Sequence, residues 1–133
     1  MKTMRVAWQM SSAVDARRAL VAELRAFGVD PVVVDEAEIV ISELVTNAVR
    51  HAKPLADGKI RVSWSVRGSV VEIDVTDGGG PTTPRPAPRS VWSAGGRGLR
   101  IVGSLAHEWG VRENSSGNTV WASMGGPSSR HSP

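Results

Sequence analysis

Three polar residues recur every four positions between Glu43 and His51, and their side chains could bind a ligand together with a metal ion. Glu43, Asn47 and His51 share one side of a predicted helix, next to the apolar stripe of the same helix. A carboxylate there could polarise a hydroxyl or a water, and the Asn oxygen could ligate a hard cation such as Mg²⁺. An ordinary solvated helix edge would give the same spacing, and His51 fits a structural role equally well.

A second candidate residue, Asp77, ends a predicted strand. Alternation over residues 70–76 puts Val71, Ile73 and Val75 on one face, and Asp77 has the parity of that apolar face. A carboxylate there must find a hydrogen-bond donor, which the exocyclic amine of a purine would supply. The three glycines that follow would let the backbone approach a flat ring. The alternative is a glycine-rich turn in which the Asp caps its own backbone.

A third segment, Gly95-Gly96-Arg97-Gly98-Leu99, leads into a short apolar helix predicted at about 98–106. Glycines before a helix present free backbone N–H groups at the positive end of the helix dipole, which suits a phosphate. Arg97 could add a charge-assisted hydrogen bond. Taken alone, this segment also fits a plain loop.

In this order and spacing the three segments resemble the GHKL ATP-binding fold of gyrase, histidine kinases and the mismatch-repair MutL proteins. Within that fold, the chain resembles the small anti-sigma-factor serine/threonine kinases over roughly residues 5–125. The ten residues from Glu43 to Ala52 match the N box of the family almost residue for residue. The resemblance implies an α+β fold, a two-layer sandwich with three helices on one face of a mostly antiparallel sheet. ATP would lie between the two layers.

The resemblance also implies roles for individual residues. Glu43 falls where the family has a catalytic, base-like carboxylate, and Asn47 falls on the ligand of the Mg²⁺ that bridges the phosphates. Asp77 falls on the residue that reads the adenine amino group, with Gly79 beneath the ring. Thr119 resembles the threonine that supports the adenine and its Asp.

The phosphates would meet the third segment, in which the ATP-binding positions are Gly96, Arg97, Gly98 and Leu99. Two positions depart from the family pattern: Pro81 stands where a further glycine is common, and Asn118 stands where threonine is usual. Neither change removes a proposed ligand, but both bear on the geometry of the bound nucleotide.

Three functions follow from the resemblance. The first is an anti-sigma-factor kinase that binds ATP and Mg²⁺, sequesters a sigma factor and phosphorylates an antagonist protein, with a homodimer as a further possibility. The second is an ATP-binding regulator without appreciable kinase activity. The third, a detached histidine-kinase catalytic domain, is less favoured because the chain has no helical dimerisation segment with a phospho-accepting His.

Composition agrees with one globular domain. The 133 residues are 41% hydrophobic and include no cysteine, which excludes disulfides and cysteine-ligated metals. No segment is long and apolar enough to span a bilayer, and no signal peptide is visible, so a cytoplasmic protein without membrane attachment is expected. The net charge of +3 is small and its basic residues are spread out, which disfavours direct nucleic-acid binding.

Hydrophobic periodicity and turn residues predict the other elements. Asp30 is expected to cap the long helix that carries the N box, with Pro31 at its first position and Lys53-Pro54 as its end. Ser11 or Ser12 is expected to cap the helix before it. Residues 1–125 form the predicted GHKL domain with a flexible ATP lid at about 78–97, and 126–133 form a disordered tail. The predicted ranges are strands 4–9, 59–66, 70–76, 107–113 and 118–124 and helices from 11 or 12 to 27, 31 to 53 and 98 to 106.

Overall fold

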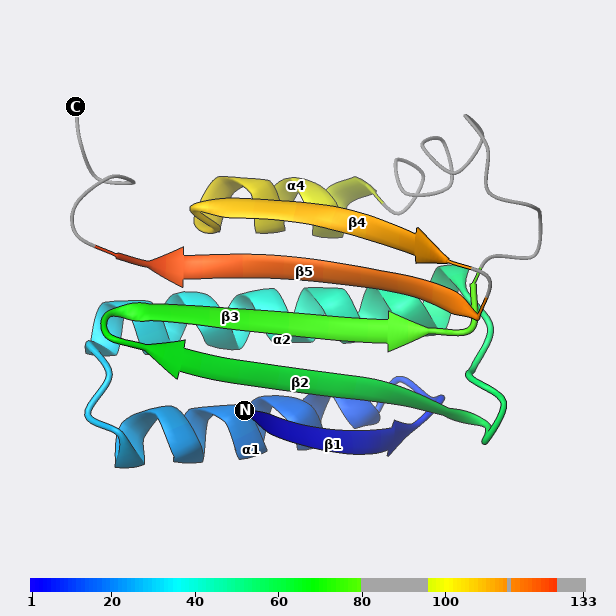
Figure 1. Cartoon of the computed structure of the whole chain (residues 1–133), viewed down its shortest axis with the longest axis horizontal. Helices are drawn as coiled ribbons and strands as arrows, with labels where there is room; N and C mark the ends of the chain where they lie inside the picture. Colours follow the sequence, from blue (N-terminus) through cyan, green and yellow to red (C-terminus); the bar gives the residue numbers. More distant parts are fainter. Residues whose placement is uncertain (80–95, 115, 127–133) are drawn as a thin grey trace.

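The structure is a computed structural model that describes residues 1–79, 96–114 and 116–126, without the side chains of 96–99 and 114. Within these ranges the sheet has the order β1-β2-β3-β5-β4, and every neighbouring pair is antiparallel. Three helices cover one face of this sheet (Figure 1), which confirms the predicted two-layer α+β sandwich. None of the helices in the described part is long and apolar enough to cross a bilayer. The elements are β1 (Lys2–Ala7), α1 (Ser12–Ala26), α2 (Pro31–His51), β2 (Lys59–Arg67), β3 (Val70–Asp77), α4 (Gly96–Leu105), β4 (Glu108–Asn114) and β5 (Gly117–Gly125).

Helix α2 lies in the middle of the helical layer and begins as the sequence predicts. The Asp30 carboxylate accepts a hydrogen bond from the Val32 N–H at 2.8 Å, and Pro31 occupies the first helical position, where no N–H is needed. The helix ends at His51, two residues before the predicted Lys53. Its apolar stripe is buried against the sheet at Val33, Val34, Ala37, Val40, Ile41, Leu44, Val45 and Ala48.

Helix α1 differs from the prediction at its start. Ser11 occupies the cap position but has helical backbone angles and makes no side-chain capping bond, so the predicted serine cap is wrong. The Ser12 hydroxyl instead donates to the Ala7 carbonyl at 2.6 Å and ties the helix to the end of β1. At the other end, Gly28 adopts φ +72° and stops the helix as predicted, because a side chain is disfavoured in that conformation.

The core lies between the helices and one face of the sheet. Alternate residues of β2 and β3 point into it, and Trp64 packs there with its indole N–H donating to the Glu23 carboxylate at 3.1 Å. The apolar face predicted for strand 70–76 is therefore confirmed. The buried sheet residues on this face are Val6, Ile60, Val62, Trp64, Val71, Ile73, Val75, Val120, Ala122 and Met124.

The strand boundaries deviate from the prediction most at β1, which was expected at 4–9. It ends at Ala7 because Ala7 pairs with Lys59, the first residue of its partner β2.

Of the predicted lid, residues 80–95 lie outside the described residues, while Gly78 and Gly79 follow β3 and α4 begins at Gly96. All of the predicted tail except Gly126 also lies outside them.

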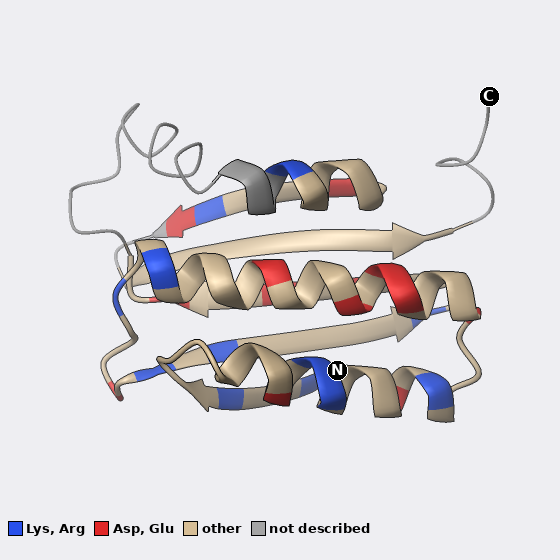
Figure 2. Ribbon diagram, turned by 180° about the vertical axis from the view of Figure 1, so that it is seen from behind, with Lys and Arg blue, Asp and Glu red and all other residues tan. Residues whose placement is uncertain are grey.

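Basic and acidic residues lie on both long helices of the helical layer (Figure 2). Helix α1 carries arginines and carboxylates alike, whereas the charged residues of the neighbouring α2 are mostly carboxylates. The two helices are linked by an ion pair between Arg17 and Glu38, with 3.5 Å between nitrogen and oxygen. Both side chains are more than a third exposed, so this pair adds little to stability.

The two helix starts give a matched test of capping. Asp30→Ala should lower the free energy of unfolding by about 1 kcal/mol, because the Val32 N–H loses its acceptor. Ser11→Ala should change it by less than about 0.5 kcal/mol, because that hydroxyl caps nothing. Urea denaturation of the two variants and the parent measures both values. Equal losses in the two variants would contradict this account of the helix starts.

Candidate functional site

The predicted site residues come from one end of the sandwich, where β3 ends and β5 begins. Because these strands are antiparallel, Asp77 pairs with Asn118. The loop after α2 joins the same end through two backbone hydrogen bonds, from the Gly78 N–H to the Lys53 carbonyl at 2.7 Å and from the Lys53 N–H to the Gly79 carbonyl at 2.9 Å. The C-terminal end of α2 and the turn that follows Asp77 are therefore held together by main-chain hydrogen bonds.

Asp77 is fully buried, with 0% of its surface exposed. One carboxylate oxygen, Oδ1, accepts the Gly79 N–H at 2.7 Å, so the residue does cap its own turn. The other oxygen, Oδ2, is buried and has no hydrogen-bond partner among the described residues. A carboxylate oxygen in that position is costly unless a donor reaches it, and an amine of a bound ligand is such a donor.

The surroundings of Asp77 also raise the pKa of its carboxyl group. Burial raises the pKa of its carboxyl from 3.8 to about 6, and the backbone N–H groups of Gly79 and Asn118 offset part of that rise by stabilising the anion. At neutral pH the carboxylate is therefore ionised and can act only as an acceptor. An amino group is a suitable partner for it, whereas a carbonyl oxygen is not.

Asn47 lies on the face of α2 that packs toward the sheet and is only 5% exposed. Its Nδ2 is buried and has no hydrogen-bond partner among the described residues. Glu43, one turn earlier, and His51, one turn later, are both half-buried. Glu43, Asn47 and His51 thus lie along one side of α2, as predicted. Asn47, the middle residue, has a buried N–H group that lacks an acceptor among the described residues.

Two glycines at this end have no room for a side chain. A Cβ on Gly78 would overlap the Pro54 carbonyl oxygen, and a Cβ on Gly117 would overlap the Asp77 carbonyl oxygen. Gly79 is different, because its φ of +95° favours glycine while the nearest atom to an added Cβ is 3.9 Å away. Among the described residues, the backbone is therefore packed more tightly at Gly78 and Gly117 than at Gly79, where the lack of a side chain would let a flat ligand approach the main chain.

Thr119 does not point toward Asp77. Its hydroxyl shares a hydrogen bond of 2.8 Å with the hydroxyl of Thr76, and both side chains lie on the sheet face away from the helices. The residue that has the parity of Asp77 is Asn118, which is 5% exposed. In the sequence, Asn118 is noticeable as a departure from the family pattern, but its alternation with Val120 and Ala122 already places it on the buried face.

Helix α4 begins at Gly96, two residues before the predicted start, so the glycines form its first turn and do not precede it. Gly96, Arg97, Gly98 and Leu99 are thereby the residues whose N–H groups an α-helix leaves without an internal acceptor. Their side chains lie outside the described residues, and Arg100 next to them is exposed. A helix start with free N–H groups can bind a phosphate.

Another group of charges lies on the outer face of the sheet, away from these residues. Burial and the neighbouring Glu72 raise the pKa of the Asp74 carboxyl to about 6, and Arg112, 3.2 Å away, partly offsets this. The Arg112 guanidinium also lies 5.9 Å from the centre of the Trp121 ring. No side chain of this group reaches the buried face that carries Asp77.

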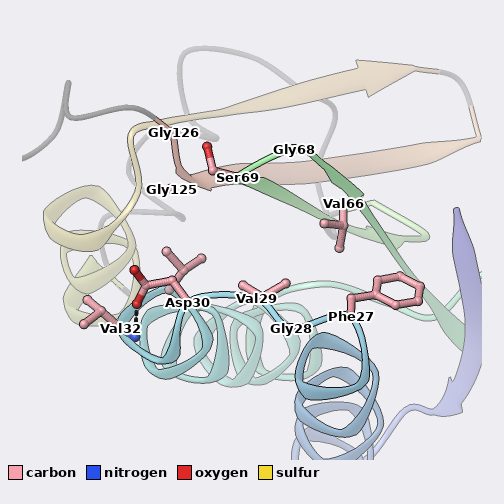
Figure 3. Close-up of a pocket in the computed structure, with 11 residues that line it drawn as sticks. Phe27, Gly28, Val29, Asp30, Val32, Val66, Gly68, Ser69, Gly125 and Gly126 are labelled. Atoms are coloured by element: carbon pink, nitrogen blue, oxygen red, sulfur yellow. Dashed lines mark hydrogen bonds between the residues drawn. The ribbon is translucent and has the colours of Figure 1, made fainter.

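A pocket of about 580 Å³ lies at the opposite end of the sandwich (Figure 3). It is bounded by the α1–α2 loop, the β2–β3 turn and the end of β5, with Phe27, Val29 and Val66 among its apolar walls. The residues of the N box and the turn at Asp77 do not line it. We therefore assign the pocket no part in the predicted chemistry.

The chain is similar to known proteins in both sequence and fold. Residues 8–124 match the family model of the histidine kinase-like ATPase domain, so the chain belongs to this family. Its fold is similar to a crystal structure of the RsbU and RsbW domains of Rv1364c from Mycobacterium tuberculosis, with a TM-score of 0.69 and 22% identity. That match covers 96% of this chain and 34% of the other, so this chain spans about a third of its neighbour. No curated protein sequence matches the chain significantly.

The cost of burying Asp77 can be measured by its pH dependence. Between pH 3.8 and about 6 the folded protein binds more protons at this site than the unfolded chain, so stability falls as pH rises through that window. Asp77→Asn removes the titration and keeps an oxygen for the Gly79 N–H. The free energy of unfolding of the variant, minus that of the parent, should rise by about 2 kcal/mol between pH 4.5 and pH 7.5.

Urea denaturation of both proteins at both pH values supplies this difference. The titration of Asp74 contributes equally to the two proteins and so does not affect the difference. A difference that stays constant with pH would show that Asp77 is not a buried, destabilising carboxylate.

Proposed function

We propose that this protein is an ATP-binding anti-sigma-factor serine/threonine kinase. It would act in the cytoplasm, hold a sigma factor and phosphorylate an antagonist of the anti-sigma factor, with a homodimer as its working form. Membership of the histidine kinase-like ATPase family supports nucleotide binding, and the residues of the N box support the narrower assignment. The observation that carries the proposal is the buried Oδ2 of Asp77, which has no hydrogen-bond partner in the part of the chain that the structure describes.

In this proposal Asp77 selects adenine. Its Oδ2 accepts a hydrogen bond from the exocyclic amine, while Gly79, which has no side chain, lets the backbone approach the face of the ring. Thr119 acts indirectly, through its hydrogen bond to Thr76, which precedes Asp77 in β3. The base is thereby held between the layers of the sandwich, at the end where β3 and α2 are joined.

Asn47 and the start of α4 would hold the phosphates. The Asn47 carboxamide is buried, and its N–H groups find no acceptor among the described residues. Its oxygen would be a suitable ligand for Mg²⁺, together with phosphate and water oxygens. When bound, the ion neutralises charge on the phosphates during transfer. The backbone N–H groups of Gly96, Arg97, Gly98 and Leu99 would face the same phosphates.

Glu43 would act on the protein substrate. Its carboxylate accepts the proton of a serine or threonine hydroxyl while that oxygen bonds to the γ-phosphorus. The bond from the γ-phosphorus to the bridging oxygen breaks, and ADP leaves with the electron pair. Because Glu43 is half-buried, a substrate hydroxyl could reach it from the surface.

The first test separates metal-dependent binding from general stability. Asn47→Ala should abolish detectable Mg·ATP binding in calorimetry, because the ion loses its protein ligand. Ser42→Ala is the matched control on the same helix, since that hydroxyl donates only to the Glu38 carbonyl of its own helix. Wild-type affinity in Asn47→Ala, or an equal loss in Ser42→Ala, would contradict the metal-binding role.

The second test concerns catalysis. Glu43→Ala should retain Mg·ATP binding and lose at least about a hundredfold in transfer of radiolabelled γ-phosphate to an antagonist protein, as expected for a general base. Unchanged transfer would remove Glu43 from the mechanism. Binding by the parent protein without transfer to any antagonist would favour an ATP-gated regulator over a kinase.

A further inference from the structure

One side chain outside the N box and the glycine segments is connected to the proposed nucleotide site. The indole N–H of Trp8 donates to the carbonyl of Ala52 at 3.1 Å, across 44 residues of sequence. Ala52 follows the last residue of α2 and is 8% exposed, whereas Trp8 is 44% exposed. A half-exposed ring thus makes a specific contact with the loop that leaves the N box.

This contact continues by hydrogen bonds to Asp77. Lys53, next to Ala52, forms the two main-chain hydrogen bonds with Gly78 and Gly79. The Gly79 N–H in turn donates to Asp77 Oδ1. Gly78 cannot move toward the loop, because even a Cβ there would overlap the Pro54 carbonyl oxygen. A displacement of Ala52 and Lys53 would therefore displace the turn that orients the Asp77 carboxylate.

Trp8 is itself held from the other side. The carbonyl of the preceding Ala7 accepts two hydrogen bonds, from the Ser12 hydroxyl at 2.6 Å and from the Gln9 N–H at 2.9 Å. The loop between β1 and α1 is thereby fixed to both elements. Trp8 connects this fixed loop to the one that holds the turn at Asp77.

We propose that Trp8 is a positioning residue for the nucleotide site, acting on Asp77 through the loop of Ala52 and Lys53. The inference rests on the proposed function, because it presumes that Asp77 reads the adenine. It extends that function to a surface residue outside the family motifs. The exposed side of the Trp8 ring is then a place where an external contact changes nucleotide affinity, and where bound nucleotide changes the environment of the ring in return.

The test compares two tryptophan variants and uses ADP as the probe. Trp8→Phe keeps an aromatic ring and removes the N–H donor, whereas Trp121→Phe alters a ring on the outer face of the sheet. Calorimetry should give an ADP dissociation constant about three- to tenfold higher in Trp8→Phe, as expected for one lost hydrogen bond. Trp121→Phe should bind as the parent does.

A second readout separates positioning from a general effect on stability. In ¹⁵N-labelled parent protein, the indole N–H resonance of Trp8, assigned by its loss in Trp8→Phe or in Trp8→His, should shift on saturation with ADP. The indole resonance of Trp64, which is held by Glu23 in the core, should shift much less.

The outcomes are distinct. An unmoved Trp8 resonance at saturating ADP, or equal weakening in Trp8→Phe and Trp121→Phe, overturns the inference and leaves the proposed function intact. If the parent protein binds no ADP in calorimetry, the proposed function fails and the inference fails with it. Should Trp8→Phe not fold, the resonance of the parent protein decides alone.

Discussion

The whole site depends on one buried carboxylate. Asp77 is the last residue of β3, and its side chain points to the buried face of the sheet. The strand therefore places a negative charge on a face whose other β3 side chains are valine and isoleucine. Two backbone N–H groups stabilise that charge, but burial dominates and raises the pKa of the group to about 6. A protein keeps such a destabilising group where it serves a function, because an apolar residue would be more stable there.

The surrounding backbone restricts the orientation of this carboxylate. Gly78 and Gly117 are packed so closely against main-chain carbonyl groups that the turn and the start of β5 have little freedom. The loop after α2 is bonded to the turn by Lys53, which couples Asp77 to the helix that carries Asn47. Asp77, proposed to read the base, and Asn47, the proposed metal ligand, are therefore parts of one main-chain framework, although thirty positions separate them in sequence.

Sequence periodicity was sufficient to predict the elements of this framework. The four-residue spacing of Glu43, Asn47 and His51 predicted a helix stripe, and strict alternation predicted the buried position of Asp77. Both follow from the fixed repeats of helices and strands, which do not depend on distant contacts. The cap of α2 was predictable for a similar reason, since Asp30 and Pro31 act on the nearest turn alone.

The features that were missed depend on residues far apart in the chain. Ser12 bonds to Ala7 and leaves α1 without a serine cap, which depends on how closely β1 approaches that helix. The hydrogen bond between the hydroxyls of Thr119 and Thr76 was not predicted either, because it depends on the pairing of β3 with β5. The contact between Trp8 and Ala52 has no local sequence signal, because it forms only when the ends of β1 and α2 meet.

The most direct test of the central claim compares two nucleotides that differ at the amine of the base. Inosine diphosphate has the same phosphates as ADP but presents a carbonyl oxygen in place of that amine, which would face the unpartnered oxygen of Asp77. Calorimetric titration at pH 7.5 should show ADP binding at least about a hundredfold more tightly, because the mismatch leaves buried polar groups unpaired. Equal affinities for the two nucleotides, or no binding of either, would contradict the claim that Asp77 reads adenine.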